Sequence, residues 1–279
     1  MALTVNANTA ASSAITQLGR TDRRLARAYE RVSSGLRISR AADDAAGLGV
    51  AENLRVAFRS ARVAQRNVGD GISMISVAEG ASTEVASILG RMRELAVQGA
   101  SETLDDAQRA YIQDEFVALS AEVDRISAVT EFNGINLTDA SITGGVLAVQ
   151  VGIHNTASDQ IEITLGDLSA STLGVDTGTI DMSTSALAST ALTDIDAAIT
   201  IVSGYRSDYG AAENRLGNSL SNLERFTENT VAAESAIRDA DFGYEAVEMA
   251  KSQILQQAGV AVLAQAKRLN EGVLQLLQA

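Results

Sequence analysis

The sequence predicts a mainly α-helical fold: a long helical rod with coiled-coil terminal helices, an elongated helical bundle and a small β-hairpin region. Three patterns carry this expectation. Apolar residues recur every seven positions near both ends of the chain, step by threes and fours through most of the middle, and alternate with polar residues in one short stretch. The first two patterns have the period of a helix, and the third has the period of a strand.

The first helix is predicted from apolar residues spaced seven apart. The row consists of Ala11, Leu18, Leu25 and Val32, and three of its members are followed four positions later by Ile15, Tyr29 and Leu36. So narrow a row is typical of a coiled coil. A helix with such a row cannot bury it alone, so we expect a partner helix.

Three long helices are predicted in the middle of the chain. Apolar residues from 50 to 96 step by threes and fours almost without interruption, which indicates a helix of up to about 50 residues. A second helix covers residues 112–126 and ends before Asn133-Gly134, a strong turn signal. A third runs from about residue 191 to residue 236.

A β-hairpin is predicted at about residues 146–166. Leu147, Val149 and Val151 alternate with smaller or polar residues, and Ile161 and Ile163 do so after a polar loop that contains His154. An isolated hairpin is marginally stable, so we expect it to lie on the helices.

The last helix carries a second row spaced by seven residues: Leu255, Val262, Leu269 and Leu276. The simplest partner for the first helix is therefore the last one. Neither row is broad, and we infer that the stability of both helices depends on neighbouring molecules.

Composition excludes most kinds of chemistry. The 279 residues contain no Cys and one His, and 22 basic residues stand against 35 acidic ones, for a net charge of −13. We therefore expect no enzyme activity, no cofactor and no metal site, and the negative charge argues against nucleic-acid binding.

The acidic pairs Asp43-Asp44 and Asp105-Asp106, and Asp239 with Asp241, are interpreted as charges at helix starts. The apolar runs are too short to predict membrane insertion, and the first 20 residues show no cleaved secretory signal.

Several motifs closely resemble those of bacterial flagellins. They are ERVSSGLRI at residues 30–38 with ADDAAG at 42–47, NVGDGIS at 67–73, RMRELAVQ at 91–98, FNG at 132–134, SQILQQAG at 252–259 and VLAQA at 262–266. The likeness covers nearly the whole chain, but large variable outer domains are missing, because residues 135–189 leave room only for the hairpin and loops.

The resemblance implies a secreted filament subunit for swimming motility, exported through the flagellum's own channel without a cleaved signal peptide. It implies an inner domain of residues 1–44 plus 240–279 and an outer rod-like domain of residues 45–239. It also implies a homopolymer and, as partners, the filament cap, hook-associated proteins and an export chaperone. Arg91, Leu95 and Glu115 match positions at which some flagellins contact Toll-like receptor five.

Assembly is expected to couple to folding of the two ends. Residues 1–44 and 240–279 have little to bury against in a lone subunit, so we expect them to be disordered in the monomer and helical in the filament. The predicted assembly interface consists of Leu18, Leu25, Val32, Arg31, Leu255, Val262, Leu269 and Leu276. Arg24, Arg27 and Arg31 are expected to pair with acids such as Asp241, Glu245 and Glu248, within or between subunits.

Two other functions remain open from the sequence. A hook–filament junction protein shares the helical ends, although the SQILQQAG stretch and the match along the whole chain favour the filament subunit. A secreted coiled-coil adhesin would bind a surface without polymerising. Seeded growth of long filaments separates both from a filament subunit.

Overall fold

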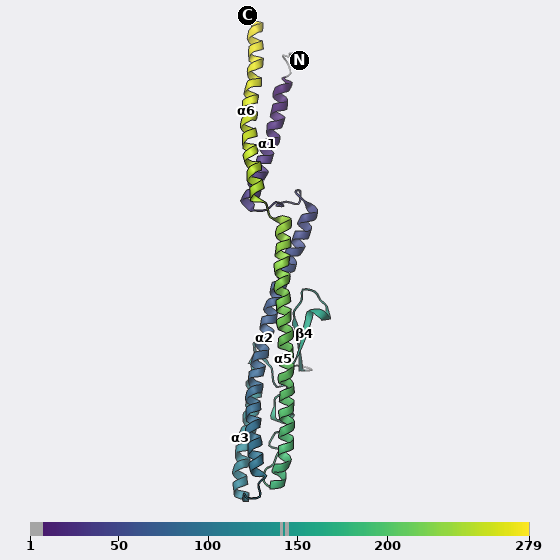
Figure 1. Ribbon diagram of the computed structural model, residues 1–279, viewed down its shortest axis with the longest axis vertical. Coiled ribbons are helices and arrows are strands. Elements are labelled where there is room, and N and C mark those ends of the chain that lie inside the picture. The colour runs from purple at the N-terminus through teal and green to yellow at the C-terminus, as the bar shows by residue number, and fades with distance from the viewer. Residues whose placement is uncertain (1–7, 140–141, 143–144, 279) are drawn as a thin grey trace. The chain divides into compact units, whose positions relative to one another are not determined.

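The computed structural model describes residues 8–139, 142 and 145–278, with side chains up to residue 268. These residues form six α-helices and two small two-stranded sheets (Figure 1). The predicted mainly helical fold with a small β region is thus confirmed. The chain forms two compact units, which we call the terminal unit (residues 1–57 with 229–279) and the central unit (58–228). The domain boundaries predicted from the sequence, after residues 44 and 239, stay a prediction.

The first helix ends one residue before a glycine. Helix α1 (Thr9–Ser34) begins after Asn8, whose side-chain oxygen accepts the Ala11 N–H at 2.8 Å, and it is followed by Gly35 with φ +71°. Glycine reaches this left-handed conformation without steric cost. The predicted helical row therefore stops before Leu36, which forms an antiparallel bridge with Asp239 instead.

The remaining long helices cover the predicted ranges and extend beyond them. They are α2 (Ala45–Gly99), α3 (Asp106–Val129), α5 (Ser185–Arg238) and α6 (Phe242–Gln278).

Carboxylates mark several helix starts, as predicted. Asp44, Asp105 and Asp241 each accept a backbone N–H from the first turn, at 2.7–2.8 Å. Asp43 differs, because it lies in the linker before α2. There it accepts hydrogen bonds, chiefly from the Arg40 backbone N–H, which lower the pKa of Asp43. The prediction is also wrong for Asp239, which follows the last residue of α5 and forms a bridge with Leu36.

The central unit has two apolar clusters. In the first, α2, α3 and α5 pack around Leu89, Phe116 and Ile195, none of which is accessible to solvent. The short helix α4 (Ala170–Leu173) and the segment that follows it contribute Leu173 and Met182 to the same cluster. The second cluster joins α2 and α5 to the predicted hairpin.

The hairpin consists of β3 (Val146–Gln150) and β4 (Gln160–Thr164), joined by a loop that holds His154 and the 3-10 helix η2 (Ala157–Asp159). The strands are antiparallel, with Val146 opposite Thr164 and Gln150 opposite Gln160. As predicted, the apolar side chains of Val149, Ile161 and Ile163 point to the helices and are buried.

Two tyrosines of α5 fix the chain after β4. The Gly166 N–H donates to the hydroxyl oxygen of the buried Tyr209 at 3.0 Å, and burial raises the pKa of Tyr209. A Cβ at residue 166 would lie 2.2 Å from the ring of Tyr205, so only glycine fits beneath this ring.

A second, smaller hairpin follows α3. Strands β1 (Glu131–Phe132) and β2 (Ile135–Asn136) are joined by Asn133 and Gly134, which have φ of +52° and +75°. Positive φ at both central residues is typical of the tight turns that the Asn-Gly pair favours. The turn was predicted, and the two-residue strands that flank it were not.

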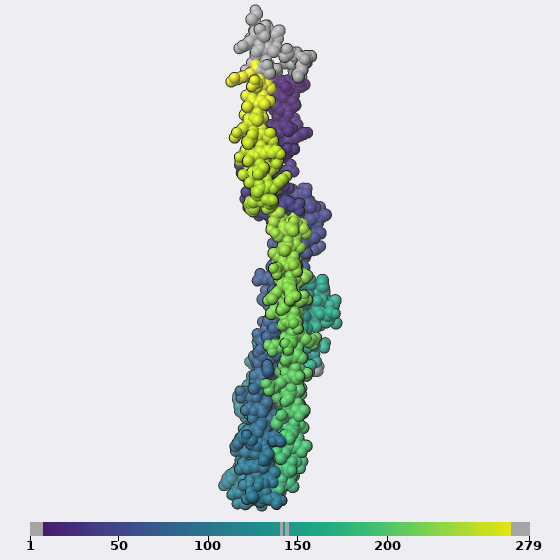
Figure 2. Space-filling model, in the orientation of Figure 1, coloured from purple at the N-terminus to yellow at the C-terminus, as the bar shows by residue number. Residues whose placement is uncertain are grey.

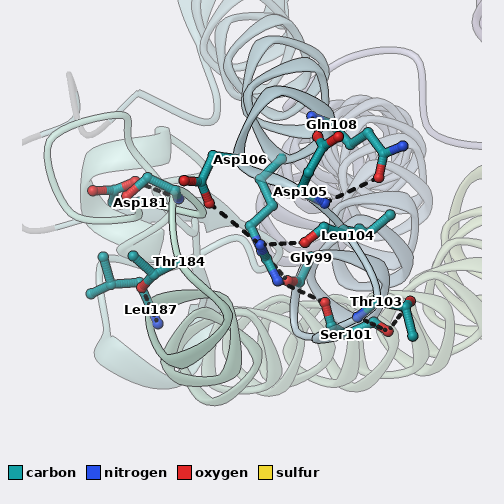
Figure 3. Close-up of polar contacts among 12 residues, drawn as sticks. Gly99, Ser101, Thr103, Leu104, Asp105, Asp106, Gln108, Asp181, Thr184 and Leu187 are labelled. Atoms are coloured by element: carbon teal, nitrogen blue, oxygen red, sulfur yellow. Dashed lines mark hydrogen bonds and ion pairs between the residues drawn. The ribbon is translucent and has the colours of Figure 1, made fainter.

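A buried arginine holds the turn between α2 and α3. The guanidinium of Arg109, a residue that is 7% exposed, donates to the carbonyl oxygens of Gly99, Ser101 and Leu104 at 3.2, 2.8 and 2.7 Å. Figure 3 shows these three carbonyls converging on one guanidinium. Since the last carbonyls of a helix lack partners within the helix and carry partial negative charge, Arg109 both satisfies and neutralises the end of α2.

Helices α2 and α5 each contain an 18-residue window that is long and apolar enough to cross a membrane. These same helices supply buried residues to both clusters of the central unit, and the core helix of a globular unit passes the same test. The expectation of no membrane insertion stays a prediction.

Replacement of Arg109 should destabilise the central unit. We expect Arg109→Met to lower the free energy of unfolding by about 2–4 kcal/mol, because one buried and two partly buried carbonyls lose a charged donor at once. The matched control is Arg125→Met, since Arg125 makes a bidentate contact with Glu122 on the exposed surface and should cost less than about 1 kcal/mol. Urea unfolding followed by circular dichroism measures both. Equal losses for the two variants would contradict the role given to Arg109.

Candidate assembly interface

In the terminal unit α1 lies beside the first part of α6, up to about Ala266, and α6 continues past the start of α1 (Figures 1 and 2). Tyr29 accepts a hydrogen bond from Gln253 at 2.8 Å, and Asp22 accepts one from Gln256 at 2.8 Å. Earlier residues of α1 therefore lie against later residues of α6, which makes the pair antiparallel. The predicted pairing of the first and last helices is present within one chain.

The face of α1 that meets α6 contains part of the predicted row. Leu18, Leu25 and Val32 are half-buried, and the smaller Thr21 and Ala28 between them are almost fully buried. The residues predicted four positions after this row are less covered: Ile15 and Tyr29 remain about half exposed, and Tyr29 meets α6 through its hydroxyl, which accepts the hydrogen bond from Gln253. The contact thus depends on small side chains flanked by larger ones.

The face of α6 that meets α1 was not predicted. It is formed by Glu245, Ser252, Gly259 and Ala266, which are spaced seven apart and which we call the inner face of α6. A Cβ at residue 259 would lie 3.3 Å from the Leu18 side chain, so the helices approach closely there. The Ser252 hydroxyl is buried and has no hydrogen-bond partner among the described residues. An unpaired buried hydroxyl costs about 1–3 kcal/mol, so this contact is weaker than its close packing suggests.

The predicted row of α6 lies on another face. Leu255 is 44% exposed and Val262 is 59% exposed, and with Val247 and Ile254 they form what we call the open face of α6. We expected the first helix to pair with this row. Within one chain the small residues of the inner face meet α1 instead, and Leu255 and Val262 stay exposed, so their part in the assembly interface stays a prediction. Leu269 and Leu276 belong to α6, but their side chains lie outside the described residues.

One predicted ion pair joins the two helices. A terminal nitrogen of Arg31 donates to Glu245 Oε1 at 3.0 Å, and the Glu245 side chain is 6% exposed. Other acids of the prediction are engaged elsewhere: Glu248 contacts Lys251, and Asp241 caps α6. A buried carboxylate needs such a partner, because the loss of the cation would leave an uncompensated charge.

The residues matched to an innate-receptor contact fall into two environments. Arg91 and Glu115 lie on the exposed surface of the central unit and bond to each other at 2.8–2.9 Å. Hydrogen bonds to Glu115, and then to Glu94, raise the pKa of Arg91. Leu95 is 1% exposed and packs in the core of α2, α3 and α5, so it is not part of the surface.

No group of three or more His, Asp or Glu side chains is arranged for a metal ion in the described part of the chain. The features of the terminal unit that stand out are instead those of an interface: a narrow contact between α1 and α6, and an apolar face of α6 that the described residues leave largely exposed.

Comparison with known proteins identifies the family. Residues 5–143 match the bacterial flagellin N-terminal helical region, and residues 192–277 match the bacterial flagellin C-terminal helical region. The chain is 42% identical to a flagellin of Halalkalibacterium halodurans over 98% of this chain and 99% of that protein. It is 41% identical to a flagellar filament core protein of Brachyspira hyodysenteriae over 88% of this chain and 90% of that protein.

A flagellin of Bacillus subtilis is 39% identical over 98% of this chain and 99% of its own length. A crystal structure of Bacillus cereus flagellin is 31% identical and covers 57% of this chain and 88% of that one, with a TM-score of 0.49. Both helical regions of one family and full-length relatives near 40% identity lead to the same conclusion: the chain belongs to the bacterial flagellins.

Proposed function

We propose that the chain is a structural subunit that polymerises into a bacterial flagellar filament, and that copies associate through the open face of α6. The family consists of structural subunits, so the chain is not an enzyme. The observation that supports the interface is the exposure of Val247, Ile254, Leu255 and Val262 on a helix whose inner face is already covered. Full burial of each such side chain stabilises an assembly by about 1.5–3 kcal/mol.

The finer expectations from the sequence are part of the same proposal. Residues 1–44 with 240–279 would form the inner domain of the filament, and residues 45–239 the outer one. An export chaperone would cover the open face before assembly, because an uncovered apolar patch promotes aggregation. The filament cap and hook-associated proteins would meet the subunit at the filament ends, after export without a cleaved signal peptide.

The proposed innate-receptor contact is narrower than the resemblance implied. Arg91 and Glu115 are accessible, so they remain candidates for contact with Toll-like receptor five. Leu95 is excluded from a direct contact by its burial. A hook–filament junction protein and a secreted adhesin would not grow long filaments from seeds, and the relatives named as filament core proteins favour the filament subunit.

A charge on the open face should prevent growth. We expect Leu255→Asp to raise the critical concentration for seeded filament growth by more than tenfold, because an unpaired carboxylate would be buried between copies. The matched control is Gln257→Asp, which places the same charge on an exposed position of α6 outside both the inner and the open face. Electron microscopy and sedimentation of seeded protein measure the effect. Normal growth of Leu255→Asp would refute the interface.

The Arg31–Glu245 pair gives an asymmetric prediction. Arg31→Ala leaves a buried carboxylate alone, whereas Glu245→Ala adds a small residue to the small residues of the inner face. We therefore expect Arg31→Ala to raise the critical concentration about tenfold or more, equivalent to about 1.4 kcal/mol. The double variant should recover most of this loss. If the critical concentration of the double variant is as high as that of Arg31→Ala, the unpaired Glu245 carboxylate is not the cause of the loss of assembly.

Coupled folding predicts different protection of α1 and α6 in the two states. The α1–α6 contact buries mostly small side chains, while ordering costs about 1–2 kcal/mol for each residue. Backbone amides of these helices should therefore exchange rapidly in dilute subunits and slowly in filaments, with α2 and α3 as the internal reference in both. Hydrogen exchange followed by mass spectrometry measures the exchange rates in dilute subunits and in filaments. If the amides of α1 and α6 are already protected from exchange in the dilute subunit, the hypothesis of coupled folding is wrong. The proposed interface on α6 would not be affected by that result.

A further inference from the structure

The central unit has a strand with an open edge. Among the described residues β3 pairs with β4 alone. Two hydrogen bonds at the ends of this ladder, from Leu165 N–H to Gly145 O at 2.7 Å and from Val151 N–H to Asp159 O at 2.8 Å, fix its pattern. Because such bonds alternate along an antiparallel pair, the odd-numbered residues of β3 bond to β4.

The backbone groups of Val146, Ala148 and Gln150 therefore point away from β4. An independent contact agrees, since the Gln150 carbonyl accepts a hydrogen bond from Asn67 of α2 at 3.3 Å. Open strand edges are usually blunted by proline, lysine, a bulge or a covering segment. The strand Val146–Gln150 contains neither proline nor lysine, and its register with β4 is continuous.

A groove runs along this open edge. It has a volume of about 780 Å³. It is lined by Gly71 and Met74 of α2, by residues 147–150 of β3, and by Phe132 and Ile135 of the β1–β2 hairpin. Adjacent strands lie about 4.7–4.9 Å apart, and the groove offers a strand-like ligand both free backbone groups and apolar contacts.

The surroundings of the groove are acidic. Asp70 lines it, Glu131 precedes Phe132, and Glu162 stands opposite Ala148 in the ladder. Residues 126–205 contain no Lys or Arg, and the central unit as a whole has 10 basic residues against 24 acidic ones. Arg66, next to Asn67 in the chain, does not line the groove. A second copy of so acidic a unit is a poor occupant, because like charges repel.

We infer that this groove binds an extended basic segment of another protein, which adds a strand to β3. The backbone of the segment would bond to Val146 and Ala148. Its apolar side chains would enter the space over Met74 and beside Phe132, and a lysine or arginine would lie near Asp70. Backbone bonds supply affinity in strand addition, while the side-chain pockets and charges supply selectivity.

The test uses a synthetic peptide of seven alternating lysine and valine residues, acetylated, amidated and fluorescently labelled. We expect saturable binding to the wild-type chain by fluorescence anisotropy, with a dissociation constant below 1 mM, and at least tenfold weaker binding of the corresponding glutamate–valine peptide. Ala148→Pro removes an N–H that points away from β4 and should weaken binding at least tenfold, because the added strand loses a donor. The control Ala148→Val keeps the N–H and should bind as the wild type does.

Folding of the variants is checked through the amides of Ile161 and Ile163, which face β3 and should stay protected from hydrogen exchange. If Ala148→Pro disturbs the hairpin, Ile135→Lys gives the same test, since it places a like charge on the groove wall at an exposed residue. Unchanged binding by the folded variants, equal binding of the acidic peptide, or no binding at 1 mM would overturn the inference. So would dimers of the wild type that Ala148→Pro abolishes, because a second copy would then occupy the edge.

Discussion

The close approach of α1 and α6 is the contact on which the terminal unit depends. It is made by small residues on both sides, with Thr21 and Ala28 on α1 and Ser252, Gly259 and Ala266 on α6. Small residues let two helix backbones come near each other, but each buries little apolar area. Because the contact uses the small residues, the larger Leu255 and Val262 are left exposed. One helix thus has a covered inner face and an exposed apolar face, and we propose that the exposed face binds other copies.

The central unit, in contrast to the terminal unit, packs through large side chains. Its helices bury large side chains completely, among them Leu89, Phe116 and Tyr209, and a hairpin covers part of what the helices alone would leave open. Polar groups in this core have partners, as the Tyr209 hydroxyl and the Arg109 guanidinium illustrate. We therefore expect the central unit to be the more stable of the two in a single copy, since the terminal unit has a narrow contact and, among the described residues, an unpaired hydroxyl at Ser252.

Sequence periodicity was sufficient to predict the five long helices and the main hairpin, because each of these elements has a face with a clear spacing, whereas the short helix α4 was not predicted. It failed at α6, where two faces have the same seven-residue spacing. The leucine-rich row is the more conspicuous one, but Ser252, Gly259 and Ala266 repeat just as regularly, and small residues at that spacing were the available signal. Arg109 left no signal of this kind, since its burial depends on three backbone carbonyls whose positions only the folded turn defines.

The distribution of charge bears on how a polymer of this chain can form. The terminal unit has 12 basic residues against 11 acidic ones, whereas the central unit has 10 against 24. Copies can therefore bring their terminal units together with little electrostatic cost, while strongly negative central units repel one another and resist unspecific association. Apolar attraction and low net charge coincide in the same unit. Under the proposed interface, growth would be directed by the terminal helices. Added salt, which screens the repulsion between central units, should then affect that contact less than substitutions on the open face do.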